Sequence, residues 1–209
     1  MALKRERGKE KQRNTGKRER KRIILFAAEG SNKTETNYLR RFQSDTVQIR
    51  FTAGNETDPV KMMQRLIEEF RGISPEPGDC AYCMVDGDVN PSKNAQIAAA
   101  DKLAKGMAVR QIVSNPCFEV WFLNHYRYTT KQFHSSLEVI AALTDEYPPY
   151  TKNGTEMYDR TVAQISVAID RSRKQEQYCA GAGYKPHTSD FQPSTEVYLV
   201  IEDIYSGAK

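Results

Sequence analysis

A short apolar run, Ile23-Ile24-Leu25-Phe26-Ala27-Ala28-Glu29-Gly30, ends abruptly at a glutamate. The pattern recurs further along the chain in Met84-Val85-Asp86-Gly87-Asp88, where two aspartates follow the apolar residues. Runs of this kind are typical of strands buried in a parallel sheet, and open α/β sheets place their sites at the carboxyl ends of such strands. Taken alone, each run favours a simpler interpretation, in which acidic residues follow strands because loops are polar.

The chain between residues 23 and 113 alternates between strand and helix patterns. We expect strands at 23–28, 47–51, 81–85 and 108–113, and helices at 34–42, 59–72 and 92–105. Thr34 can cap the first helix, and Asp58-Pro59 marks the start of the second, because a capping residue precedes a proline. This order predicts an α/β fold with a Rossmann-like, four-stranded, mostly parallel sheet flanked by helices.

A parallel sheet brings the two acidic motifs to one edge. The carboxyl ends of all its strands point the same way, so Glu29, Asp86 and Asp88 meet if the first and third strands are neighbours. Three carboxylates at one place are hard oxygen donors, which suit a divalent cation such as Mg²⁺. The two weak motifs therefore predict one metal site.

The chain of 209 residues suits one well-buried domain with small additions. Residues 1–22 carry eleven basic and three acidic residues, so all of the positive excess of the chain lies there. We expect this segment to be a disordered basic arm, suited either to phosphate contacts or to solubility alone. Residues 23–127 are then the catalytic core, and residues 128–209 a C-terminal helical extension packed on it.

Cysteine use and hydropathy indicate a cytoplasmic protein. No apolar run approaches the length that spans a bilayer, and no secretory signal is evident. Cys80 and Cys83 lie three apart in an expected strand, so they point to opposite faces, which argues against a shared zinc ion. We interpret the four cysteines as free thiols in a reducing compartment.

Glu119 is an acidic residue in an otherwise apolar helix. Pro116 is well placed at the start of this helix, and Phe118, Trp121 and Phe122 lie on one face of it. Two interpretations of Glu119 are open. It is either stabilised by the positive N-terminal end of the helix dipole, or it is a further member of the metal site. His125 and His134 have no metal-like partner in the sequence, so we treat them as structural or surface residues. Ser194-Thr195-Glu196 is expected to open a last helix over 197–204.

Five motifs, in this order, closely resemble the RloB family and cover almost the whole chain after Lys21. They are Glu29-Gly30, Thr34-Glu35-x-x-Tyr38, Asp86-x-Asp88, Ser114-Asn115-Pro116-x-Phe118-Glu119-x-Trp121 and Pro193-Ser194-Thr195. RloB proteins look like Toprim-type phosphoryl-transfer domains related to nucleases of the overcoming-lysogenization-defect family. One departure is Ala28, where relatives often have a cysteine before the glutamate.

The resemblance implies a metal-dependent nuclease of bacterial phage defence, abortive infection and restriction islands, acting on DNA or on RNA such as tRNA. It implies Mg²⁺, or Mn²⁺, as the cofactor and a separately encoded ATPase of the ABC or SMC type as a partner. Glu29 matches the Toprim glutamate that acts as general acid/base or metal ligand, and Asp86 and Asp88 match the metal-binding Asp-x-Asp. Glu35 and Glu119 match acidic family positions, which we assign to second-metal binding or orientation.

The leading hypothesis is therefore hydrolysis of a phosphodiester, with metal-bound Asp86 and Asp88 and with Glu29 at the attacking water. A cluster of carboxylates repels a polyanion, so basic side chains must hold the substrate. Our candidates, besides the basic arm, are Lys33, Arg40, Arg41, Arg171 and Arg173. The alternatives are a non-catalytic nucleic-acid-binding or sensor subunit that docks on an ATPase, and hydrolysis of a nucleotide or small phosphate. No Gly-x-x-x-x-Gly-Lys-Ser/Thr loop is present, which disfavours ATP hydrolysis by a P-loop.

Overall fold

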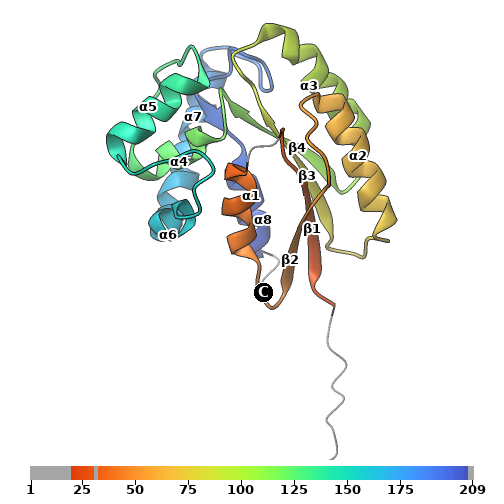
Figure 1. The fold of residues 1–209 in the computed structure, drawn as a ribbon. Helices are drawn as coiled ribbons and strands as arrows, with labels where there is room; N and C mark the ends of the chain where they lie inside the picture. The colour runs from red at the N-terminus through yellow and green to blue at the C-terminus, as the bar shows by residue number, and fades with distance from the viewer. Residues whose placement is uncertain (1–19, 31–32, 207–209) are drawn as a thin grey trace, which may run out of the picture.

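A single five-stranded sheet, in the order β2-β1-β3-β4-β5, forms the centre of the molecule (Figure 1). The structure, a computed structural model, describes residues 20–30 and 33–206. The strands are β1 Arg22–Ala27, β2 Val47–Phe51, β3 Cys80–Asp86, β4 Val109–Asn115 and β5 Ser194–Thr195. The first four are parallel, which confirms the predicted α/β fold, and β5 adds a short antiparallel edge that was not predicted.

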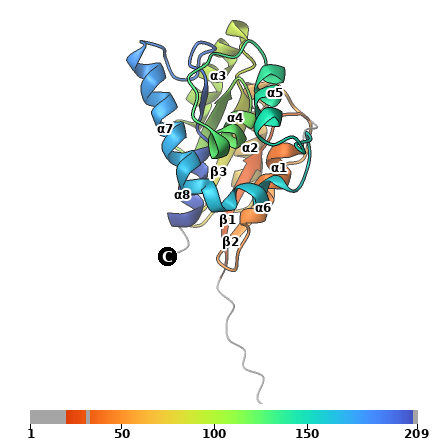
Figure 2. The ribbon, with the colours of Figure 1, turned by 90° about the vertical axis from the view of Figure 1, so that its left-hand side faces the viewer.

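Helices cover both faces of the sheet (Figures 1 and 2). The α-helices are α1 Thr34–Leu39, α2 Pro59–Gly72, α3 Pro91–Ala104, α4 Glu119–Tyr126, α5 Ser136–Glu146, α6 Met157–Thr161, α7 Ile165–Gly181 and α8 Val197–Ser206. Helices α2 and α3 lie on one face, and α1, α4 and α8 on the other. Two 3₁₀ turns, Arg40–Phe42 and Val162–Gln164, follow α1 and α6.

Strand β1 is apolar along its length because both of its faces are covered. Ile24 and Phe26 belong to the core beneath α1, α4 and α8, whereas Leu25 and Ala27 belong to the core beneath α2 and α3. Fully burying a large apolar side chain, such as that of Ile24 or Leu25, stabilises the fold by about 1.5–3 kcal/mol. The continuous apolar runs seen in the sequence thus reflect a sheet buried on both sides.

The two cysteines of β3 point to opposite faces, as predicted. Cys83 is buried in the core beneath α2 and α3, whereas Cys80 packs against the other core. Both are free thiols. Their separation by the sheet leaves no shared metal site between them.

Helix α2 begins as the sequence predicted. The side chain of Asp58 accepts a hydrogen bond from the backbone N–H of Lys61 (3.0 Å), and Pro59 occupies the first helical position. Leu66 and Phe70 are buried against the sheet. The amphipathic pattern therefore reported the buried face of this helix correctly.

Some local predictions were wrong. Ser194–Thr195 forms β5 and does not open the last helix, although α8 does begin at Val197 as predicted. Pro116 does not start a helix; its carbonyl oxygen accepts the N–H of Asp88 (2.9 Å), and α4 begins at Glu119. Thr34 does not cap α1, because its hydroxyl oxygen accepts the N–H of Asn153 (3.1 Å) instead.

The predicted basic arm, residues 1–22, lies outside the described residues except for its last three. Arg20 pairs with Asp79 (2.8 Å). Strand β1 begins at Arg22, one residue before the predicted boundary, so Arg22 belongs to the sheet. Its guanidinium donates to the carboxylate (2.5 Å) and the backbone oxygen (2.9 Å) of Asp203, which joins the first strand to the last helix. Within the described part of the chain, none of the helices has the length and apolarity needed to cross a membrane.

Candidate active site

The carboxyl edge of the sheet brings Glu29 and Asp86 together. Strands β1 and β3 are direct neighbours, with Ala27 paired to Cys83. The condition on which the two acidic motifs would meet is therefore fulfilled. The backbone N–H of Asp86 donates to Oε2 of Glu29 (3.1 Å), so the glutamate side chain lies against the end of β3.

A lysine joins two of the predicted metal ligands. Nζ of Lys93 lies 2.8 and 3.0 Å from the two carboxylate oxygens of Glu29 and 2.8 Å from Oδ2 of Asp88. Burial disfavours a charge on Lys93, but its bonds to Asp88 and Glu29 outweigh this effect and raise its pKa. The lysine is therefore a fixed positive charge among the carboxylates at the carboxyl edge of the sheet, which we call the acidic edge.

Asp86 is held at the start of α4. Its Oδ1 accepts the backbone N–H of Phe118 (2.9 Å), the residue just before that helix. The loop after β3 also runs beside the end of β4, because the backbone N–H of Gly87 donates to the backbone oxygen of Ser114 (2.8 Å). A Cβ atom at Gly87 would lie 2.6 Å from Oδ1 of Asn115, so this close approach requires glycine.

Glu35 and Glu119 are buried on the inner side of the edge. Glu119 accepts the hydroxyl of Tyr150 (2.9 Å), whereas Oε2 of Glu35 has no hydrogen-bond partner among the described residues. Burial, and then the neighbouring charge of Glu119, raise the pKa of Glu35 to about 7.

Two further carboxylates of this edge, Asp86 and Glu29, also have raised pKa values. Burial raises the pKa of Asp86 well above its usual range, and the charges of Glu35, Glu119, Glu29 and Asp88 add to this. Burial likewise raises the pKa of Glu29, against the opposing effect of Lys93. The structure thus gathers all five predicted carboxylates around one edge of the sheet.

The donor chemistry of this edge suits Mg²⁺ or Mn²⁺. Buried carboxylates with raised pKa values, and one carboxylate oxygen without a partner, are groups that a divalent cation would stabilise. In residues 20–30 and 33–206, however, no three acidic, histidine or cysteine side chains are grouped closely enough to hold an ion as they stand. The assignment of Glu29, Asp86, Asp88 and Glu35 as metal ligands thus stays a prediction.

The five predicted nucleic-acid-binding residues separate into two groups. Lys33 and Arg40 line a cavity next to Glu29. The other three are engaged within the protein: Arg41 pairs with the carboxylate of Asp159 (2.7 Å), Arg171 donates to the backbone oxygen of Asn124 (3.0 Å), and Arg173 pairs with Glu202.

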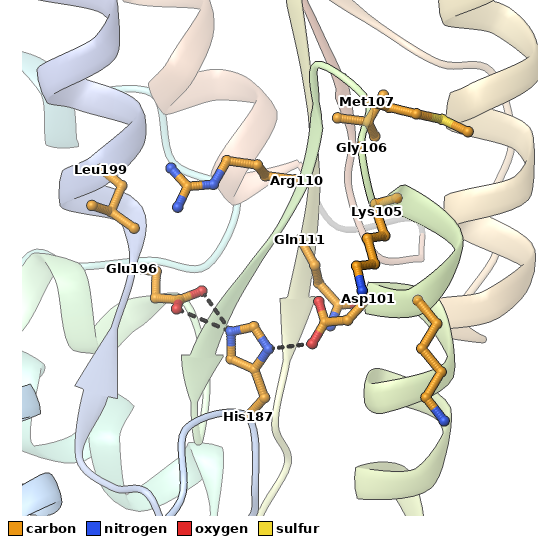
Figure 3. A pocket seen from close by; sticks show the side chains of 12 residues that line it. Asp101, Lys105, Gly106, Met107, Arg110, Gln111, His187, Glu196 and Leu199 are labelled. Atoms are coloured by element: carbon orange, nitrogen blue, oxygen red, sulfur yellow. Dashed lines mark hydrogen bonds and ion pairs between the residues drawn. The ribbon is translucent and has the colours of Figure 1, made fainter.

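A different cavity, of about 500 Å³, lies beside β4 and α3 (Figure 3), and its lining contains none of the five carboxylates. In it, His187 lies between Asp101 (2.7 Å) and Glu196 (3.0 Å). Burial opposes a charge on this histidine, but the two carboxylates raise its pKa to about 10. Since both ring nitrogens are bonded, His187 links α3 to the start of α8 as an imidazolium and serves the fold.

Sequence reasoning missed Lys93 and Tyr150. Lys93 lies in the first turn of α3, where the helix dipole favours acidic residues over basic ones. That local conflict was a signal that a nearby carboxylate holds the lysine. Tyr150 lies between α5 and α6, far from Glu119 in the sequence, and nothing local marks it. His125, treated as structural, is indeed buried, and its Nδ1 bonds the backbone oxygen of Trp121 (2.9 Å).

Comparison with known proteins identifies a family for this chain. Residues 24–204 match the family model RloB, described as RloB-like protein. The matched range runs from β1 to α8 and includes all five carboxylates and Lys93. No curated protein and no solved structure matches the chain.

Proposed function

The chain belongs to the RloB-like protein family, and we propose that it is a metal-dependent nuclease that hydrolyses phosphodiester bonds of DNA or RNA, tRNA included. The observation that carries the proposal is the acidic edge, where the backbone N–H of Asp86 bonds the carboxylate of Glu29 and Lys93 bonds both Glu29 and Asp88. A concentration of carboxylates at the carboxyl end of a parallel sheet is where α/β enzymes place chemistry. Mg²⁺ or Mn²⁺ is the cofactor that fits these donors.

Glu29 is the candidate general base. Its side chain is 18% exposed, and burial raises its pKa, which makes the carboxylate a stronger base. The N–H of Asp86 and the ammonium of Lys93 both bond its oxygens, which fixes its orientation. Its carboxylate would take the proton of the attacking water as the water's oxygen bonds to phosphorus and the bond from phosphorus to the leaving oxygen breaks, with solvent water supplying the proton of that oxygen.

Asp86, Asp88 and Glu35 would hold the cation, and Glu119 would orient its neighbours from beneath. When bound, the metal supplies positive charge at the scissile phosphate and makes bound water more acidic. Asp86 is positioned for this by the N–H of Phe118, and Glu119 is positioned by the hydroxyl of Tyr150. Lys93 adds positive charge beside the phosphate.

We further propose, from family membership, a role in phage defence in the bacterial cytoplasm together with an ABC- or SMC-type ATPase. A restrained nuclease fits the arrangement of the edge, because Lys93 already bonds Glu29 and Asp88.

The same lysine favours a second candidate, a non-catalytic nucleic-acid-binding or sensor subunit. In the described residues Lys93 bonds two of the predicted ligands, and no group of side chains is arranged to hold an ion. A protein that binds without catalysis would need no metal, so its affinity for nucleic acid should be the same with and without Mg²⁺.

Conservative variants of the edge test the proposal. Glu29→Gln and Asp86→Asn keep an oxygen that accepts the N–H of Asp86 and of Phe118, so the fold should persist. Each should lower the rate of Mg²⁺-dependent cleavage of DNA or RNA by about 100-fold or more, the effect of losing a general base or a metal ligand. Asp145→Asn, an exposed carboxylate on α5, is the matched control and should cleave at the wild-type rate.

Cleavage at the wild-type rate by both Glu29→Gln and Asp86→Asn would refute the assignment of the active site. Absence of cleavage by the wild-type protein in Mg²⁺ and in Mn²⁺, together with metal-independent binding of the same substrates, would favour the non-catalytic candidate.

A further inference from the structure

A polar cavity of about 470 Å³ opens directly beside the acidic edge. Ala28 and Gly30, the residues on either side of Glu29, form part of its lining. Its other walls are the helical segment from Lys33 to Arg40 and the loop after β2. The volume lies in the range of sites that enclose a small molecule.

Two positive charges border this cavity without a carboxylate partner among the described residues. Lys33 and Arg40 are both exposed there. Arg41, the next residue in the chain, differs because it forms two bonds to the carboxylate of Asp159 (2.7 and 3.1 Å). The side chains of Lys33 and Arg40 are therefore available to an anion, whereas that of Arg41 is neutralised.

Arg40 is held in place by an aromatic ring. Its guanidinium lies 5.3 Å from the centre of Phe51, a residue of the cavity lining. Phe51 in turn stacks on buried Phe26, with 5.4 Å between ring centres. An arginine plane fixed in this way can stack on a base and donate to a phosphate at the same time.

The loop after β2 is fixed as well. Arg65 of α2 donates to the backbone oxygen of Ala53 (2.6 Å). Gly54 has a φ of +115°, and a Cβ atom there would lie 1.7 Å from Nη1 of Arg65. The wall of the cavity is therefore built around a glycine that no other residue can replace without displacing Arg65.

We propose that this cavity binds one unpaired nucleotide of the substrate, next to the scissile phosphate, and that the protein therefore acts on single-stranded nucleic acid. This rests on the proposed nuclease function. Lys33 and Arg40 bind the phosphate, and the plane of Arg40 stacks on the base. A base paired within a duplex cannot enter a recess of this kind, whereas an unpaired base can turn into it.

Binding measured without metal tests the inference separately from cleavage. The probes are a fluorescein-labelled single-stranded 12-mer, as DNA and as RNA, and the matching duplex, in EDTA with the full chain. Wild-type protein should bind the single strand at least about tenfold more tightly than the duplex, the effect of one stacked base. Arg40→Met keeps apolar contact with Phe51 but loses the charge, and should weaken single-strand binding about tenfold.

Arg41→Met is the matched control, because it removes a neutralised charge at the adjacent residue. It should change the affinity less than about twofold, and the dependence of binding on salt should fall only for Arg40→Met and Lys33→Met. Equal losses for Arg40→Met and Arg41→Met, equal affinity for single strand and duplex, or no wild-type binding to either would overturn the inference. If Glu29→Gln still cleaves while Arg40→Met loses binding, the proposed catalytic site fails and the cavity stands.

Discussion

Replacing Lys93 with Met removes the positive charge between Glu29 and Asp88 and keeps a side chain of similar length. In the wild-type protein the ammonium makes three short contacts, at 2.8, 3.0 and 2.8 Å. The variant leaves the two carboxylates facing each other with no cation between them. We expect it to be less stable than the wild type in EDTA.

The burial of the three side chains sets the size of the loss. The Lys93 side chain is 8% exposed and that of Glu29 is 18% exposed, so this pair is close to the buried limit. Removing one partner of a buried pair costs about 3–5 kcal/mol. The Asp88 side chain is 45% exposed, and exposed pairs contribute about 0–1 kcal/mol. Because the edge opens to solvent, the expected decrease in the free energy of unfolding is about 2–4 kcal/mol.

Mg²⁺ should reverse much of this loss. If the ion binds Asp86, Asp88 and Glu35, it supplies positive charge beside Glu29, and in the variant it no longer competes with the ammonium for Asp88. A ligand at 100 times its dissociation constant stabilises a protein by about 2.7 kcal/mol. Urea unfolding of both proteins, in EDTA and in a Mg²⁺ series, measures this gain, and Lys102→Met on the exposed side of α3 is the control.

Two results would refute the reasoning. If Lys93→Met is as stable as the wild type in EDTA, the ammonium does not hold the carboxylates. If Mg²⁺ stabilises both proteins by the same amount, Lys93 and the metal do not compete for the same oxygens.

Two other changes test the surroundings of the site. The pKa of His187 in the folded protein, about 10, lies above its usual value of 6.5, so its ion pairs contribute fully below pH 6.5 and are lost as the pH rises toward 10. Urea unfolding at pH 6, 8 and 10 should show a larger decline for the wild type than for His187→Gln, and parallel declines would contradict the role given to this histidine. Tyr150→Phe removes the hydroxyl bonded to Glu119 and leaves a buried carboxylate oxygen without its donor. Thermal unfolding should show a loss of about 1–3 kcal/mol at neutral pH, and an unchanged stability would mean that the bond is weak.

The four parallel strands followed from the sequence because burial on both faces leaves a plain signal. Ile24 and Leu25 face opposite cores, so the strand that contains them is apolar throughout. The extra strand β5 gave no such signal, since two residues, Ser194 and Thr195, are too few for a period to be recognised. Strand β5 exists because Ser114 pairs with Thr195 across a long separation in the chain.

The sequence alone could predict those members of the acidic edge that directly follow strands. The residues that contact these carboxylates from other elements were harder to predict. The carboxyl ends of β1 and β3 bring Glu29 to Asp86 once the strands are neighbours. Lys93 lies in the first turn of α3, and its contact with Glu29 depends on where that helix starts above the sheet. Tyr150 reaches Glu119 through the packing of helices, which no local pattern encodes.

The bond between Arg22 and Asp203 has a consequence for synthesis of the protein. These residues are 181 positions apart, and Asn115 likewise bonds the backbone oxygens of Thr188 and Ser189. On the ribosome, Glu29 and Asp86 emerge long before the segments that complete the edge of β4. Contacts of such high sequence separation form late in folding. A nascent chain that ends before residue 188 therefore carries the carboxylates but lacks the bonds that hold Asn115 and Arg22, so the sheet around the site is completed only once residues 188 to 203 have emerged.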